Sequence, residues 1–238
     1  MKKILLGAVA AIAAIAVTPD VSLAQRGYAT QTFLPQNRGS SVTVGTIADL
    51  TGPQNSNSAI LQDLWVYPGG SDCSTDVLNR CEWIEHGKIY GTVGNYNGDS
   101  PTTAIPNYKG HFYAYNRCTD KCRFYQINYN GNIPANSGRN NYHISWANNT
   151  WYILLDDQYI QDLTIFGQLN YSKYATTGIE KQSSVYNYTN GLQFLNWRYK
   201  DLNNNWQTIN GNTQNNDSGP YGMTSTFNGN GTVTFNRP

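Results

Sequence analysis

The chain contains only three glutamates, and their placement is the first feature that could support chemistry. Glu82 and Glu85 lie in the stretch CEWIEHGKIYG, and Glu180 lies in TTGIEKQSS. Two carboxyl groups held close together cannot both ionise easily, so one of them keeps its proton. Such a pair can serve as general acid and general base in the hydrolysis of a peptide or a glycosidic bond.

Strand periodicity gives Glu85 and Glu180 similar surroundings. In an extended strand, Glu85 shares one face with Trp83 and Gly87, and Glu180 shares one face with Gly178. A glycine inside a strand often marks the close approach of another backbone or of a ligand. The same pattern is also typical of solvated surface carboxylates, so from periodicity alone both interpretations remain open.

Other catalytic patterns are absent from the sequence. There is no GxSxG elbow, no HExxH and no P-loop. His86, His111 and His143 are dispersed and lack the spacing of zinc ligands. We therefore expect no metal and no cofactor.

The first residues have the features of a secretory signal peptide. Lys2 and Lys3 precede an apolar run of 14 residues, and the small residues Ser22 and Ala24 precede a cleavage site before Gln25. The apolar run is shorter than the roughly 20 residues of a membrane span. We predict a signal peptide at 1–24 and one domain at 25–238. The protein is then expected to be secreted, to the extracellular space or to the periplasm of a Gram-negative cell.

Composition limits the partners of the chain. The formal net charge is +1 at pH 7, and no basic stripe indicates nucleic-acid binding. No amphipathic stretch indicates a membrane surface. We expect a monomer without nucleic-acid or membrane partners. The carboxyl pair, and not the composition, indicates the candidate substrates, which are a polypeptide or, in an alternative interpretation, an extracellular glycan.

Four cysteines are expected to form two disulfides, as is common in exported proteins. The favoured pairs are Cys73–Cys81 and Cys118–Cys122, and the two other connectivities are the alternatives. Their spacing fits a zinc site poorly.

About twelve strand-like runs, separated by turn clusters, predict an all-β fold. Because the runs are short and closely spaced, a two-sheet antiparallel β-sandwich of the concanavalin-like jelly-roll type is favoured. Residues 140–158 are expected to form a hairpin around Asn148–Asn149, with Trp146 and Trp151 near the turn. The expected strands cover 40–50, 61–68, 82–94, 109–117, 122–130, 140–148, 150–158, 163–171, 176–186, 192–201, 205–211 and 231–236.

Two of these segments resemble the signature regions of the neprosin-like glutamic peptidases and, more distantly, of the eqolisin-type peptidases. Ile84-Glu85-His86-Gly87 is similar to the apolar-Glu-x-Gly motif of the first catalytic glutamate. Gly178-Ile179-Glu180 is similar in part to the Gly-Gly-Glu motif of the second. The aromatic stretch HFYAY and the segment CTDKC lie between them in the family's order, and the resemblance spans roughly residues 40–200.

The resemblance implies a β-sandwich endopeptidase that acts at acid pH through a dyad of Glu85 and Glu180. By analogy with the eqolisin arrangement, Glu180 is the base that activates water, and Glu85 lies beside the developing oxyanion. Trp83, Tyr113 and Tyr115 are the candidate walls of the substrate cleft.

Two further interpretations compete with a peptidase. A sandwich rich in tyrosine and tryptophan can bind carbohydrate without catalysis, since aromatic faces stack on sugars. Two carboxylates also suit a glycoside hydrolase.

Overall fold

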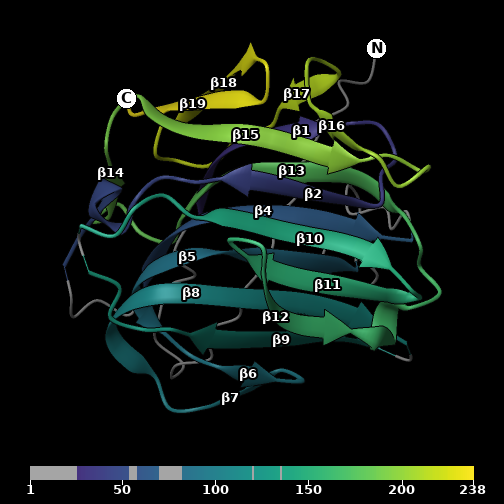
Figure 1. Ribbon diagram of the computed structural model, residues 1–238. Helices are drawn as coiled ribbons and strands as arrows, with labels where there is room; N and C mark the ends of the chain where they lie inside the picture. The colour runs from purple at the N-terminus through teal and green to yellow at the C-terminus, as the bar shows by residue number, and fades with distance from the viewer. Residues whose placement is uncertain (1–25, 54–57, 70–81, 120, 135) are drawn as a thin grey trace, which may run out of the picture.

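The computed structural model describes residues 26–53, 58–69, 82–119, 121–134 and 136–238. It consists of two large antiparallel sheets packed face to face (Figure 1). This arrangement confirms the predicted all-β, two-sheet antiparallel sandwich. The predicted signal peptide at 1–24 and the pair Cys73–Cys81 lie outside the described residues.

The first sheet has nine strands in the order β17-β1-β13-β4-β5-β8-β9-β6-β7. The strands that carry the candidate site are at its centre. The bounds are β1 Gly27–Phe33, β4 Ala59–Pro68, β5 Trp83–Val93, β6 Tyr96–Asn97, β7 Ser100–Pro101, β8 Ile105–Cys118, β9 Cys122–Tyr129, β13 Ser172–Lys181 and β17 Thr213–Asn215.

The second sheet has the order β12-β11-β10-β2-β15-β19-β18, and β16 pairs with β15 beside this path. Its bounds are β2 Gly39–Thr43, β10 Asn141–Ala147, β11 Thr150–Leu155, β12 Gln158–Leu163, β15 Leu192–Lys200, β16 Trp206–Thr208, β18 Thr224–Gly229 and β19 Thr232–Asn236. A short pair, β3 Leu50–Thr51 and β14 Asn187–Tyr188, lies apart from both sheets, and two 3₁₀ turns cover Ile47–Asp49 and Thr164–Phe166.

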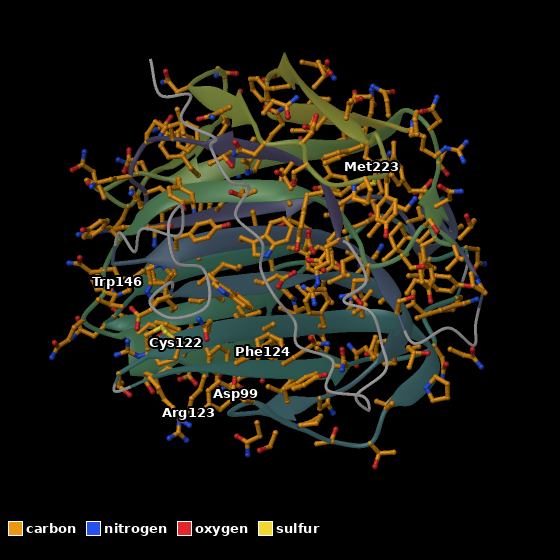
Figure 2. All side chains as sticks on the ribbon, turned by 180° about the vertical axis from the view of Figure 1, so that it is seen from behind. Asp99, Cys122, Arg123, Phe124, Trp146 and Met223 are labelled. Carbon is orange, nitrogen blue, oxygen red and sulfur yellow. A yellow bond between two sulfur atoms is a disulfide. The ribbon has the colours of Figure 1, made fainter. Side chains whose placement is uncertain are left out.

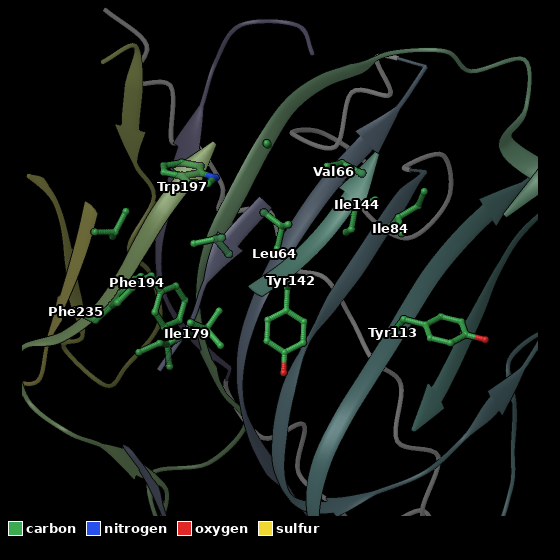
Figure 3. Close-up of a cluster of buried hydrophobic side chains, with 14 of the residues drawn as sticks. Leu64, Val66, Ile84, Tyr113, Tyr142, Ile144, Ile179, Phe194, Trp197 and Phe235 are labelled. Atoms are coloured by element: carbon green, nitrogen blue, oxygen red, sulfur yellow. The ribbon is translucent and has the colours of Figure 1, made fainter. Parts of the chain in front are cut away.

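The main hydrophobic core lies between the two sheets (Figure 3). From the first sheet, alternate residues of β4 and β5 such as Leu64, Val66 and Ile84 enter it, and they face Tyr142 and Ile144 of β10. The residues between them in sequence therefore project from the opposite face of the nine-stranded sheet. β4 is buried along its whole length, so both of its faces are covered.

The predicted hairpin is present as β10 and β11, with Asn148 and Asn149 in the left-handed conformation at φ 48° and 58°. Asparagine tolerates this conformation, which two-residue hairpin turns require. Trp146 and Trp151 are directly opposite one another across the hairpin.

The segment at 163–171 was predicted as a strand, and this prediction is wrong. Only Leu163 ends a strand, and a 3₁₀ turn follows. The indole N–H groups of Trp146 and Trp151 donate to the carbonyl oxygens of Gly167 and Leu169. Side chains therefore satisfy backbone groups that a neighbouring strand would otherwise pair.

Candidate active site

Glu85 and Glu180 project from the same face of the nine-stranded sheet, the face that points away from the second sheet. Glu85 on β5 is directly opposite Trp65 on β4, and Glu180 on β13 is directly opposite Leu61 on β4. Trp65 and Leu61 are four residues apart on one strand, so their side chains share a face. The two glutamates are nearly a hundred residues apart in sequence, and only the strand order β13-β4-β5 brings them together.

A third carboxyl group, Asp63, lies between the two glutamates on the central strand β4. Asp63 is directly opposite Gly87 on β5 and Gly178 on β13. Glu85 and Glu180 are therefore its diagonal neighbours, at the distance of about 7–8 Å between Cα atoms at which long side chains can meet. The site contains three carboxyl groups in a diagonal row.

The three carboxyl groups are buried, at 0% exposure for Asp63, 4% for Glu85 and 2% for Glu180. No N–H or O–H donor of the described residues hydrogen-bonds to either oxygen of Asp63 or to Oε1 of Glu85. A buried acceptor without a hydrogen-bond donor costs folding free energy, and a buried charge without a partner costs more.

Glu180 has a different environment, which stabilises its charged form. Its Oε1 atom lies 3.2 Å from Nη1 of Arg26 and accepts a 3.2 Å hydrogen bond from Nε2 of Gln182. The side chain of Tyr28, directly opposite on β1, also hydrogen-bonds to it. One cation and two donors make Glu180 the member of the row that is best suited to be ionised.

The pKa values follow from these surroundings. Burial raises the pKa of Glu85 to about 8, and the negative charge of Glu180 acts in the same direction. The neighbouring hydrogen-bonding groups of Asp63 and Trp65 and the positive charge of Arg26 act against this rise. Burial, together with the charge of Glu85, raises the pKa of Asp63 well above its usual range. Burial also raises the pKa of Glu180, but Arg26 and the hydrogen-bond donors oppose that shift. Neighbouring carboxyl groups with unlike environments are the usual arrangement for an acid and a base.

Trp83 lies on the same face as Glu85, as the strand periodicity predicted. It packs in a second hydrophobic cluster formed entirely by the nine-stranded sheet, with its ring centroid 5.7 Å from that of Phe124. Phe124 lies on β9 (Figure 2). Trp65 belongs to the same cluster, so aromatic rings flank the carboxyl row.

Tyr113 and Tyr115 do not lie beside Trp83, so the prediction that the three line one cleft is wrong. They are directly opposite His86 and Ile84 on β5, so their side chains project from the other face of the sheet. Tyr113 belongs to the core between the sheets (Figure 3). Tyr115 packs against that core. The reason is register, because Ala114, not its neighbours, is directly opposite Glu85.

Glu82 has a structural role near the predicted disulfide. Its carboxylate pairs with Arg117 and accepts a 3.2 Å hydrogen bond from the backbone N–H of Cys118. The predicted bond between Cys118 and Cys122 is present and links β8 to β9. Glu82 therefore takes no part in the carboxyl row.

Within the described ranges, no group of three or more His, Cys, Asp or Glu residues is arranged to hold a metal ion. No helix in that part of the chain is long and apolar enough to cross a membrane.

Three residues of the site were not predicted from the sequence: Asp63, Arg26 and Tyr28. Asp63 gave one local signal, since it is the only charged residue in the otherwise uncharged run AILQDLWVYP. Arg26 and Tyr28 gave none, because no strand was predicted before residue 40. Their relevance depends on the pairing of β1 with β13.

Among solved structures, the chain is similar to enzymes of two kinds. The chain is similar to SCP-B, a member of the eqolisin family of peptidases solved with the tripeptide Ala-Ile-His, at 9% identity, 90% and 98% coverage of the two chains and a TM-score of 0.47. It is also similar to a family 16 endo-glucanase from Bacteroides ovatus, at 10% identity, 68% and 67% coverage and a TM-score of 0.36. A second family 16 structure from Bacteroides ovatus, with a mixed-linkage glucan product, matches at 10% identity, 66% and 65% coverage and a TM-score of 0.36. No protein-family model and no curated protein matches the chain.

Proposed function

We propose that this protein is a secreted endopeptidase that hydrolyses peptide bonds by general acid–base catalysis. The observation that carries the proposal is the unlike environment of two glutamates on one face. Glu180 forms an ion pair with Arg26, whereas Glu85 adjoins Asp63 and forms no ion pair among the described residues. One glutamate is thus suited to accept a proton and the other to donate one.

The reaction follows from these two protonation states. The Glu180 carboxylate takes a proton from a water molecule as its oxygen attacks the carbonyl carbon of the peptide. Glu85 in its protonated form donates a hydrogen bond to the carbonyl oxygen, where negative charge develops. As the C–N bond breaks, Glu85 transfers its proton to the leaving amine, and the proton that Glu180 accepted balances the one given up.

A glycoside hydrolase is the second candidate, and the aromatic rings on the same face favour it. Trp83 and Trp65 flank the carboxyl row, and indole rings stack well on sugars. The contact between Asp63 and Glu85 favours the peptidase, because closely spaced, proton-sharing carboxyl groups are typical of acid peptidases. The motif resemblance around Glu85 and Glu180 favours it as well.

The substrate class can be tested directly on the exported protein. The full chain is expressed in a secreting host, recovered from the medium or periplasm, and incubated with an unfolded protein and with a mixed-linkage glucan. New amino termini with no new reducing sugar ends are the expected result. Reducing ends without peptide cleavage would establish the glycosidase instead, and hydrolysis of neither substrate would overturn the proposal.

The pH profile of cleavage is expected to be bell-shaped. Activity falls at low pH as the Glu180 carboxylate is protonated, and falls at high pH as Glu85 loses its proton. Because burial raises the pKa of Glu85 to about 8, the alkaline limb is expected near pH 8. Activity therefore extends from the acid range predicted from the sequence into the neutral range. A profile of kcat/KM from pH 3 to pH 10 measures both limbs, and an alkaline limb below pH 6 would contradict the assignment.

Export itself is also a proposal. Cleavage before Gln25 would leave Arg26 as the second residue of the secreted protein, one strand position before β1. N-terminal sequencing of the exported protein tests the cleavage site, and its molar mass in solution tests the expected monomer.

A further inference from the structure

We propose that Asp63 is a positioning residue for Glu85, and that as a neutral carboxylic acid it donates a hydrogen bond to the Glu85 carboxyl group. The inference rests on the proposed function, in which Glu85 is the general acid. Asp63 would stabilise the anion that Glu85 becomes after it has transferred its proton to the leaving amine. It would also fix the direction in which the remaining Glu85 oxygen points.

The first support is the backbone around Asp63. Gly87 and Gly178 are directly opposite it on the two neighbouring strands. A Cβ atom at Gly87 would lie 2.7 Å from Cβ of Asp63 and 2.3 Å from the carbonyl oxygen of Gln62, closer than real Cβ contacts allow. The absence of that atom lets β5 approach Asp63 closely. The glycine that the sequence placed beside Glu85 therefore makes room for a third carboxyl group.

The second support is a set of buried polar atoms with no ordinary partner. Both oxygens of Asp63 and Oε1 of Glu85 lack a hydrogen-bond donor across the described residues. The indole N–H of Trp65 lacks an acceptor within hydrogen-bond distance in the same part of the chain. Trp65 is directly opposite Glu85 and 2% exposed, and its N–H acts on the Glu85 carboxyl group. Unpartnered donors and acceptors thus converge on Glu85. A proton on Asp63 completes this network.

The third support is the charge around Asp63. The groups that act on it are Glu85 and Glu180, both acidic. Its own charge would act on Tyr67 and Tyr142, which are also acids. Negative neighbours and full burial disfavour an Asp63 carboxylate, so the neutral acid is the stable form. A carboxylic acid kept neutral by an apolar site is an effective hydrogen-bond donor.

The mutational test compares an apolar replacement with one that keeps a donor. Asp63→Leu removes the hydrogen bond to a group that becomes charged, so kcat should fall roughly tenfold to a hundredfold. The alkaline limb of the pH profile should also move to higher pH by about one unit or more, since the Glu85 anion loses its donor. Asp63→Asn retains an N–H donor of similar size and is expected to stay within a few-fold of the wild type. Asp157→Asn, an exposed carboxylate change in the turn between β11 and β12, is the control.

A measurement without catalysis separates this inference from the proposed function. Glutamate labelled with ¹³C at the side-chain carboxyl gives only three signals, from Glu82, Glu85 and Glu180. The Glu85 signal, assigned by its loss in Glu85→Gln, should titrate at higher pH in Asp63→Leu than in the wild type and in Asp63→Asn. This result would support the inference even if no peptide is cleaved.

Two results would overturn the inference. One is a Glu85 signal that titrates at the same pH in Asp63→Leu and in the wild type, both folded. The other is a wild-type Glu85 signal that titrates at the ordinary glutamate value of about 4.3, which needs no variant at all. Should Asp63→Leu fail to fold, Asp63→Ala removes the same donor without adding volume.

Discussion

Replacement of Glu180 or of Glu85 by glutamine is expected to lower kcat/KM for peptide cleavage by about 10²–10⁴-fold, the usual contribution of general acid–base catalysis. Glutamine at 180 keeps the shape and an oxygen that can face Arg26, but it cannot accept a proton from water. Glutamine at 85 keeps a hydrogen-bond donor for the carbonyl oxygen, but it cannot give a proton to the leaving amine. Steady-state kinetics on a quenched-fluorescence peptide library measures the losses.

The double variant distinguishes a working pair from two independent contributors. If the acid and the base act in one reaction, the combined loss should be close to that of a single variant, since groups that act as a unit are far from additive. Asp157→Asn, remote from the row and exposed, is the matched carboxyl-to-amide control. Full cleavage by a folded Glu180→Gln protein would remove the proposed function.

Replacement of Arg26 by methionine is expected to have the second-largest effect, on both stability and pH dependence. The ion pair with Glu180 is largely buried, with side-chain exposures of 17% and 2%. Removing one partner of a buried pair typically costs about 3–5 kcal/mol, because the other charge is left uncompensated. Urea denaturation at neutral pH measures the change in the free energy of unfolding.

The sign of the pH effect follows from the charge of Arg26. Arg26 lowers the pKa of Glu180 against the raising effect of burial. Without it the pKa rises further, so the carboxylate is lost at higher pH and the acid limb of activity moves toward neutrality. The loss of stability should shrink at low pH, where Glu180 is protonated in both proteins. Arg123→Met, an exposed arginine on β9, should change neither quantity, and an unmoved acid limb in the Arg26 variant would contradict the role of Arg26.

The local pattern of the chain was sufficient to predict its class and many of its strands. β4, β5, β8, β9 and β15 fall within a few residues of the predicted runs, because alternation of side chains is a property of each strand by itself. The bond between Cys118 and Cys122 was also predictable from a local feature, since its two cysteines are close in sequence. The common face of Trp83 and Glu85 also needed only the period of a strand.

Strand neighbours could not be predicted from such patterns. The order β1-β13-β4-β5 joins segments that are far apart in the chain, and no local signal encodes it. This order places Arg26 beside Glu180 and Asp63 between the two glutamates. The register of β8 against β5 similarly directs Tyr113 into the interior.

The sequence by itself determined which residues could do chemistry: three glutamates in an otherwise weakly charged β protein, two of them beside glycines. The tertiary structure alone decided their protonation. A carboxyl group takes its pKa from burial and from the charges around it, and both depend on residues brought together by strand pairing. Arg26 makes Glu180 the site for negative charge, whereas full burial leaves Glu85 with its proton.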